Sequence, residues 1–220
     1  MKKIKVSFPH MGNYYVAFKP MIELIADEVI IPPPITKKTM DLGAKYSPEF
    51  VCVPFKYHIG NYIESLELGA NVIVQAGGGC RFGMYGEVQE SILKKLGYDF
   101  TFIKIGNSMN PGKFIKTLQA INPKLSGFLI LKTFWFSFQR MKCIEEVEDF
   151  VRKNIGFENQ KGKFENLHKI FLNELEKTKS LKQIKAVKTK YKKLFKSIEI
   201  SRPKDVLRVG IVGELYIVME

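Results

Sequence analysis

The hydrophobic residues of this chain alternate between short apolar runs and helical repeats. Four runs have the length of strands, and they cover Ile4–Phe8, Glu28–Ile31, Asn71–Gln75 and Phe100–Ile105. Helical spacing of apolar residues covers Tyr14–Ala26, Thr36–Leu42, Pro54–Leu68, Met84–Leu96 and Pro111–Ile121. Strands that alternate with helices in this order predict an α/β fold with a mostly parallel sheet of four to five strands.

The pattern changes after Pro123. Leu125–Ile155 predicts one long apolar helix or two, and Phe164–Ile198 predicts a lysine-rich helical stretch. Asp205–Gly213 predicts a further strand that would join the main sheet or pair with another chain in a homo- or hetero-oligomer, because a bare apolar strand edge invites pairing. We therefore expect an α/β domain over 1–124 and a helical appendage over 125–204. Residues 205–220 would start a second α/β unit that is absent or supplied by another chain.

The positive charge is concentrated in the helical appendage. The net charge is +13, and Lys161–Lys204 holds 14 basic and 4 acidic residues, a surplus of ten. Arg202 is the only arginine of that segment, and its apolar seam fits a solvated amphipathic helix pair. Nucleic-acid binding would be better supported by arginines interleaved with aromatic residues. We therefore expect no nucleic acid as a partner, and leave a docking surface for an acidic protein as an alternative.

The cysteine count and the termini bear on the compartment. Three cysteines do not form the even, dense set of a secreted disulfide framework, which favours a reducing, cytoplasmic location. The N-terminus leads directly into a strand-like run without an apolar leader segment. Because no run of 18 apolar residues is present, we expect no membrane-spanning helix and no membrane partner.

Two of the cysteines are predicted to lie at one edge of the sheet. Cys52 precedes the helix that Pro54 opens, and Cys80 follows the strand Asn71–Gln75. In a parallel α/β unit, helices begin at the edge where strands end, which is the edge where such sheets bind ligands. Helix N-termini also favour a thiolate. The arrangement therefore predicts metal or redox chemistry, with the alternative that both thiols are small buried hydrophobes.

The residues around Cys80 could support such a site. Gly77, Gly78 and Gly79 would let backbone N–H groups approach a cluster or an anion, and Arg81 would compensate negative charge. Cys143 lies seven positions from both Phe136 and Phe150, so it shares a helix face with them and is expected to pack in a core. It is kept as a third candidate metal ligand, because two cysteines cannot complete a four-cysteine cage.

Three histidines complete the list of candidates. His10 follows the first strand and His58 lies one turn into the Pro54 helix, so both are placed near the same sheet edge as Cys52. Either could donate a proton or be an ordinary solvated side chain. His168 lies in the basic stretch without a partner that the sequence identifies.

Four local strings resemble one protein family. They are Pro-Pro-Pro-Ile-Thr at 32–36, Tyr-Ser-Pro-Glu-Phe-Val-Cys-Val-Pro-Phe-Lys at 46–56, Gly-Gly-Gly-Cys-Arg-Phe-Gly-Met-Tyr at 77–85 and Val-Gly-Ile-Val-Gly-Glu-Leu-Tyr at 209–216. They look like the 2-hydroxyacyl-CoA dehydratase and acyl-CoA dehydratase activase-related superfamily of anaerobic bacteria. The resemblance covers residues 4–110 and 205–220.

The resemblance implies an oxygen-sensitive iron–sulfur protein with Rossmann-like domains. It implies a 4Fe-4S cluster held by Cys52 and Cys80, open at one iron or shared between subunits, and an activase that supplies electrons. An acyl-CoA or CoA-like ligand and a second α/β subunit would be the partners. We therefore expect a component of the dehydratase system that acts in dehydration or low-potential electron transfer. The alternative is a non-catalytic module that binds a CoA or nucleotide phosphate, or a partner protein.

Overall fold

A parallel sheet organises the N-terminal half of the chain. The computed structural model describes residues 3–76, 84–105, 111–206, 209–210, 212–213 and 216. Its four strands are β1 (Lys5–Ser7), β2 (Glu28–Val29), β3 (Val72–Ala76) and β4 (Thr101–Ile105), in the order β2-β1-β3-β4. Every strand pair is parallel, which confirms the predicted α/β class and the four predicted strand positions.

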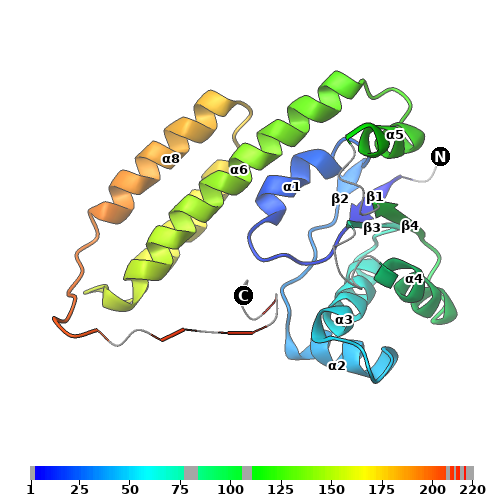
Figure 1. Ribbon diagram of the computed structural model, residues 1–220, viewed down its shortest axis with the longest axis horizontal. Coiled ribbons are helices and arrows are strands. Elements are labelled where there is room, and N and C mark those ends of the chain that lie inside the picture. The colour runs from blue at the N-terminus through cyan, green and yellow to red at the C-terminus, as the bar shows by residue number, and fades with distance from the viewer. Residues whose placement is uncertain are drawn as a thin grey trace. The chain divides into compact units, whose positions relative to one another are not determined.

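The helices follow the predicted alternation, with small changes at their ends. The helices up to the middle of the chain are α1 (Tyr15–Ile22), α2 (Lys37–Tyr46), α3 (Val53–Glu67), α4 (Tyr85–Lys95) and α5 (Pro111–Ile121). The later ones are α6 (Gly127–Asn154), the short 3₁₀ helix η2 (Ile155–Phe157), α7 (Lys163–Glu176) and α8 (Leu181–Lys196). The segment Leu125–Ile155 therefore contains one long helix, α6 (Figure 1). The lysine-rich stretch forms two helices, α7 and α8.

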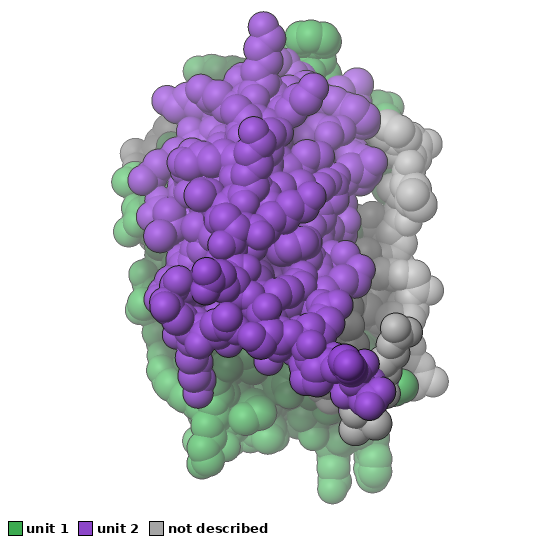
Figure 2. Space-filling model, turned by 90° about the vertical axis from the view of Figure 1, so that its left-hand side faces the viewer, with its two compact units in different colours: residues 1–12, 20–130, 212–220 green, residues 13–19, 131–211 purple. Residues whose placement is uncertain are grey.

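The chain divides into two compact units (Figure 2). Unit 1 comprises residues 1–12, 20–130 and 212–220, and it contains the whole sheet. Unit 2 comprises residues 13–19 and 131–211, and it contains most of α6 together with α7 and α8. Unit 1 is therefore built from three separate stretches of the sequence.

Two glycines bring α2 and α3 into backbone contact in unit 1 (Figure 1). A Cβ atom at Gly43 of α2 would overlap the carbonyl oxygen of Lys56, and a Cβ atom at Gly60 of α3 would overlap that of Thr39. The buried Thr39 hydroxyl also donates a hydrogen bond of 2.7 Å to Glu64 on α3. Because any larger residue at either glycine would separate the helices, the pair fixes where α3 lies.

Helix α3 is the most deeply buried helix of unit 1. Every residue from His58 to Leu66 is buried. Its apolar side chains share a core with residues of β3, α4 and β4; the fully or nearly buried members are Phe55, Ile59, Tyr62, Ile63, Leu66, Ala70, Ile73, Leu93, Phe100 and Phe102. A helix buried on all sides must satisfy its polar groups within the protein, and this requirement shapes the candidate site below.

Unit 2 has a separate core and contains a buried arginine. Cys143, Ile144 and Val147 of α6 pack with apolar residues of α7 and α8. Arg140 is 3% exposed, and its guanidinium donates to the carbonyl oxygen of Val16 at 2.9 Å and to the Thr178 hydroxyl at 3.2 Å. The buried charge is thus hydrogen-bonded rather than left unpaired.

The structure differs from the prediction of a strand over Asp205–Gly213. The described residues of this segment lie outside any strand, and Val209 and Val212 are 74% and 97% exposed. An apolar run forms a strand only when a sheet edge pairs with it, and no such pairing involves the described part of the segment. Within the described ranges, no helix is both long and apolar enough to cross a membrane.

We predict that Gly60→Ala destabilises unit 1 by about 2 kcal/mol or more, although alanine favours helix formation. The added methyl group must displace the Thr39 backbone. Gly156→Ala, where an added Cβ meets no atom within 4 Å, is the matched control. Chemical denaturation of both variants measures the difference. Equal stability of the two variants would show that the α2–α3 contact relaxes freely.

Candidate functional site

Cys52 lies at the carboxyl edge of the sheet, as its sequence position predicts. It is the N-cap residue of α3, with extended backbone angles (φ −68°, ψ 158°) and Pro54 in the first turn. Its side chain makes no capping hydrogen bond, and the free thiol is exposed. The sulfur is therefore accessible to a ligand and does not cap the N-terminus of α3.

Among the described side chains, that of Tyr85 contacts this thiol. Its hydroxyl oxygen lies 2.8 Å from Cys52 Sγ, within hydrogen-bond distance. Its ring packs edge-on against Phe55, with centroids 4.8 Å apart. Tyr85 begins α4, the helix that follows the carboxyl end of β3, so the contact joins the N-termini of α3 and α4.

Cys80 and its neighbours lie outside the described residues. Gly77, Gly78, Gly79 and Arg81, the predicted cofactor-binding residues, lie in the same undescribed stretch. In the sequence, this stretch joins Ala76 at the end of β3 to Met84 before α4. Cys80 is thus five positions from Tyr85, the residue that contacts Cys52. The described residues therefore place Cys52 at the carboxyl edge of the sheet, together with Ala76 and Met84, which flank the undescribed stretch that contains Cys80.

Cys143 lies in a different environment. It is 2% exposed in the core of unit 2, where the spacing with Phe136 and Phe150 placed it. Burial raises the pKa of its thiol to about 12, so the group stays protonated at neutral pH. Metal ligation by cysteine requires the thiolate, which this site disfavours. Among the described residues, no group of three or more histidine, cysteine or acidic side chains could hold a metal ion.

A hydrogen-bonded network connects α3 to two loops of unit 1. Asn61, 1% exposed, accepts a hydrogen bond of 2.9 Å from the His10 backbone N–H and donates one of 2.8 Å to the Pro33 carbonyl oxygen. His10 follows β1, and Pro33 follows β2. The buried amide of Asn61 therefore holds the loops that follow β1 and β2. These loops lie at the same sheet edge as Cys52.

The same network contains a buried histidine. His58 Nε2 lies 2.8 Å from the hydroxyl of Tyr216, and this hydroxyl donates to the His10 carbonyl oxygen at 3.0 Å. Because a phenol has one proton to donate, His58 carries its proton on Nε2 and donates to Tyr216. Burial lowers the pKa of His58 to about 3. His58 is thus a buried, neutral structural group, which differs from both alternatives that its sequence position allowed, a proton donor and a solvated side chain.

His168 lies on α7 in unit 2. Its Nε2 is 3.3 Å from an oxygen of Glu148, a partner on α6 that the sequence does not identify. Tyr85, Asn61 and Tyr216 were also missed as site residues. Asn61 could have been suspected as a polar residue inside an apolar helical repeat, whereas nothing local marks the other two.

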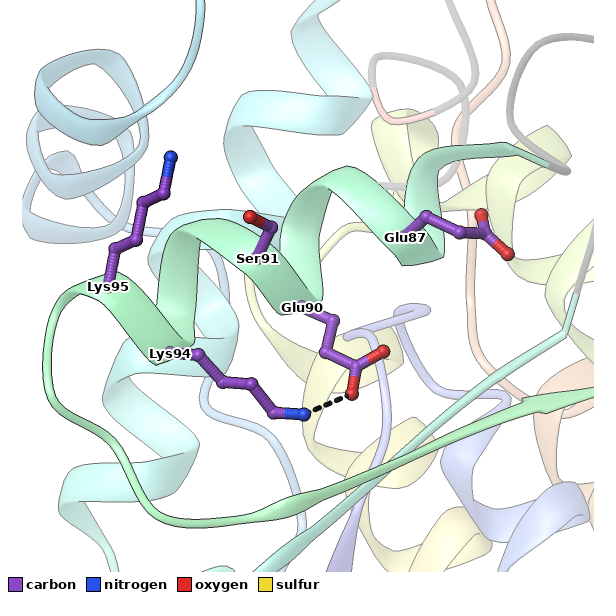
Figure 3. A pocket seen from close by; sticks show the side chains of 5 residues that line it. All are labelled: Glu87, Glu90, Ser91, Lys94 and Lys95. Carbon is purple, nitrogen blue, oxygen red and sulfur yellow. Dashed lines mark hydrogen bonds and ion pairs between the residues drawn. The ribbon is translucent and has the colours of Figure 1, made fainter.

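Two pockets of the described structure lie away from Cys52. One, of about 530 Å³, lies on the outer side of α4 and is lined by Glu87, Glu90, Ser91, Lys94 and Lys95 (Figure 3). Lys94 and Glu90 within it form an ion pair of 2.7 Å, so this charge pair is already balanced. The other, of about 250 Å³, is lined by residues at the amino ends of β1, β3 and β4, the opposite edge of the sheet. Neither pocket is a candidate for cysteine chemistry.

We predict that Cys52 reacts with maleimide at least about a hundred times faster than Cys143 in the native protein, because Cys52 is exposed and Cys143 is buried. Mass spectrometry of the digested, labelled protein at successive times measures both rates. In denaturant the two rates should converge. Comparable native rates would show that the core around Cys143 opens readily.

We predict that His58 makes unit 1 acid-sensitive. In the unfolded chain, His58 takes up a proton when the pH falls below its ordinary pKa of 6.5. In the folded chain, it does so only when the pH approaches the lowered pKa of about 3. Stability therefore falls as the pH decreases through this range, by about 2 kcal/mol between pH 7 and 5. Denaturation of the parent and of His58→Gln at pH 7 and 5 measures it. The variant should lose less stability on acidification, and equal losses would assign the sensitivity to other groups.

Comparison of this chain with protein-family models, with curated proteins and with solved structures gives no match. The α/β fold is therefore established by the strand order and the parallel pairing described above. The function must be inferred from the chemistry of the residues at the Cys52 edge.

Proposed function

We propose that this chain is an iron–sulfur component or paralogue of the 2-hydroxyacyl-CoA dehydratase system, with Cys52 and Cys80 as cluster ligands. The observation that carries the proposal is the exposed Cys52 thiol beside Tyr85, five positions after Cys80 in the sequence. The family resemblance at 46–56 and 77–85 identifies the same two cysteines. The role would be dehydration of an acyl-CoA or transfer of low-potential electrons.

The residues at Cys52 fit a thiolate ligand. The sulfur is neither in a disulfide nor used as a helix cap, and it is exposed at the end of a helix whose N-terminal dipole favours negative charge. The Tyr85 hydroxyl lies 2.8 Å from this sulfur and would donate a hydrogen bond to it in a cluster-bound state. Hydrogen bonds to ligating sulfurs raise the reduction potential of a cluster, so Tyr85 would be a positioning and tuning residue.

The neighbouring sequence would complete the site. A 4Fe-4S cluster, when bound, supplies one-electron chemistry and, at an iron without a cysteine, a coordination position for a substrate oxygen. Gly77, Gly78 and Gly79 would allow close backbone approach, and Arg81 would offset the charge of cluster and thiolates. Two cysteines leave ligand positions that an activase or a second α/β subunit could fill.

We predict that anaerobic reconstitution with iron and sulfide loads the parent protein and gives broad absorbance near roughly 400 nm. Cys52→Ala and Cys80→Ala should abolish both iron uptake and this absorbance. Cys143→Ala should retain them, and it serves as the matched cysteine control. Circular dichroism establishes that each variant is folded.

Two results would contradict the proposal. Loss of iron only in Cys143→Ala would assign the cluster to unit 2. Absence of iron uptake by the parent protein would favour the alternative function, a non-catalytic α/β module for a CoA or nucleotide phosphate or for a partner protein. In that case, binding of coenzyme A measured by calorimetry would become the next test.

A further inference from the structure

Helix α6 exposes large apolar side chains on one side in unit 2. Leu131, Phe134 and Trp135 are 48%, 51% and 53% exposed, and Phe138 is half-buried with its ring centroid 5.8 Å from that of Trp135. Their spacing of three and four positions places them along one side of the helix. We call these four residues the α6 ridge. A cluster of this size on a protein surface normally marks an interaction site.

The ridge is not the core-facing side of α6. Cys143, Ile144 and Val147, one to two turns further along, are 2%, 0% and 0% exposed and form the core of unit 2. Leu131 and Trp135 therefore carry exposed apolar area that the described core of unit 2 does not cover. By the usual relation between area and free energy, covering them would be favourable.

The charged residues of the α6 segment that carries the ridge are all basic. Between Gly127 and Ile144 they are Lys132, Arg140 and Lys142, and the first carboxylate of the helix is the exposed Glu145, seven positions after Phe138. Lys132 and Lys142 are exposed on α6, and Lys142 Nζ lies 4.8 Å from the centre of the Phe138 ring. Arg140 points inward to its buried hydrogen bonds. The surface that covers the ridge must accept apolar rings and carry negative charge.

An anionic lipid surface satisfies both requirements together. Helices that lie in the headgroup layer present Trp, Phe and Leu to the acyl chains and lysines to the lipid phosphates. A second copy of the chain fits less well, because two facing ridges would bring Lys132 and Lys142 of both copies close together. An acidic protein would need a groove shaped to this convex helix side, whereas a lipid layer adapts to it.

We propose that the α6 ridge binds an anionic membrane surface, with Trp135 and its apolar neighbours in the headgroup layer and Lys132 and Lys142 on lipid phosphates. The helix would lie in the membrane plane, consistent with the absence of a spanning helix among the described residues. This proposal replaces the expectation that the chain has no membrane partner. It does not depend on the iron–sulfur proposal, and its test requires no iron.

Trp135 is the only tryptophan of the chain and reports on its own environment. Its fluorescence should shift to shorter wavelength when the protein meets vesicles of phosphatidylglycerol and phosphatidylcholine in equal parts. The affinity for vesicles of phosphatidylcholine alone should be lower by a factor of about ten or more, since these vesicles carry no net negative charge for the two lysines. High salt should weaken the binding to the anionic vesicles. Vesicle flotation measures the bound fraction independently.

Paired variants separate the ridge from general effects. Leu131→Ser should reduce binding severalfold, whereas Ile170→Ser, at a 58% exposed residue of α7, should not. The double variant Lys132→Glu, Lys142→Glu should abolish the preference for anionic vesicles. Lys182→Glu, Lys185→Glu makes the same change of net charge on α8 and should retain the preference. Circular dichroism confirms folding of all variants.

Three outcomes would overturn the proposal. The first is an unchanged Trp135 spectrum and no flotation with anionic vesicles. The second is equal loss of binding in the α6 and α8 charge variants, which would assign binding to net charge. The third is a shift without vesicles that grows with protein concentration and accompanies a dimer in sedimentation, which would assign the ridge to a second copy.

Discussion

The close contact between α2 and α3 is the constraint on which the candidate site depends. Gly43 and Gly60 allow each helix to reach the backbone of the other, so α3 cannot move away from α2 without losing buried contacts. The position of α3 then determines where Cys52 stands at its first turn and where Asn61 meets the two strand loops. A site at the sheet edge is thus positioned by a packing contact along the length of the helix that precedes β3.

Much of this arrangement follows from short-range patterns. The parallel sheet was predicted from four apolar runs separated by helical repeats, and all four strands form there. Pro54 indicated a helix start, which placed Cys52 at the N-cap of α3. The seven-residue spacing of Cys143 with two phenylalanines indicated a core position, and burial of that thiol agrees. These features depend on local spacing, so the sequence contains them directly.

The rest depends on contacts between residues far apart in the chain. The α2–α3 contact needs two glycines whose role appears only once the helices pack, since glycine in a helix otherwise only weakens it. Cys52 and Tyr85 are 33 positions apart, and no periodicity links them. The segment near Tyr216 has the apolar composition of a strand, yet Tyr216 is buried beside His58, and Val209 and Val212 are exposed. Tertiary context decides such cases.

The hydrogen bond between His58 and Tyr216 also constrains the order of events during synthesis. These residues are 158 positions apart, and all of the unit 2 segment 131–211 emerges between them. A ribosome adding about 5 to 20 residues per second needs on the order of ten to thirty seconds for that distance. During this time the α/β unit lacks Tyr216, and His58 cannot form this hydrogen bond. Folding of unit 2 can therefore precede the completion of unit 1, although unit 1 begins first.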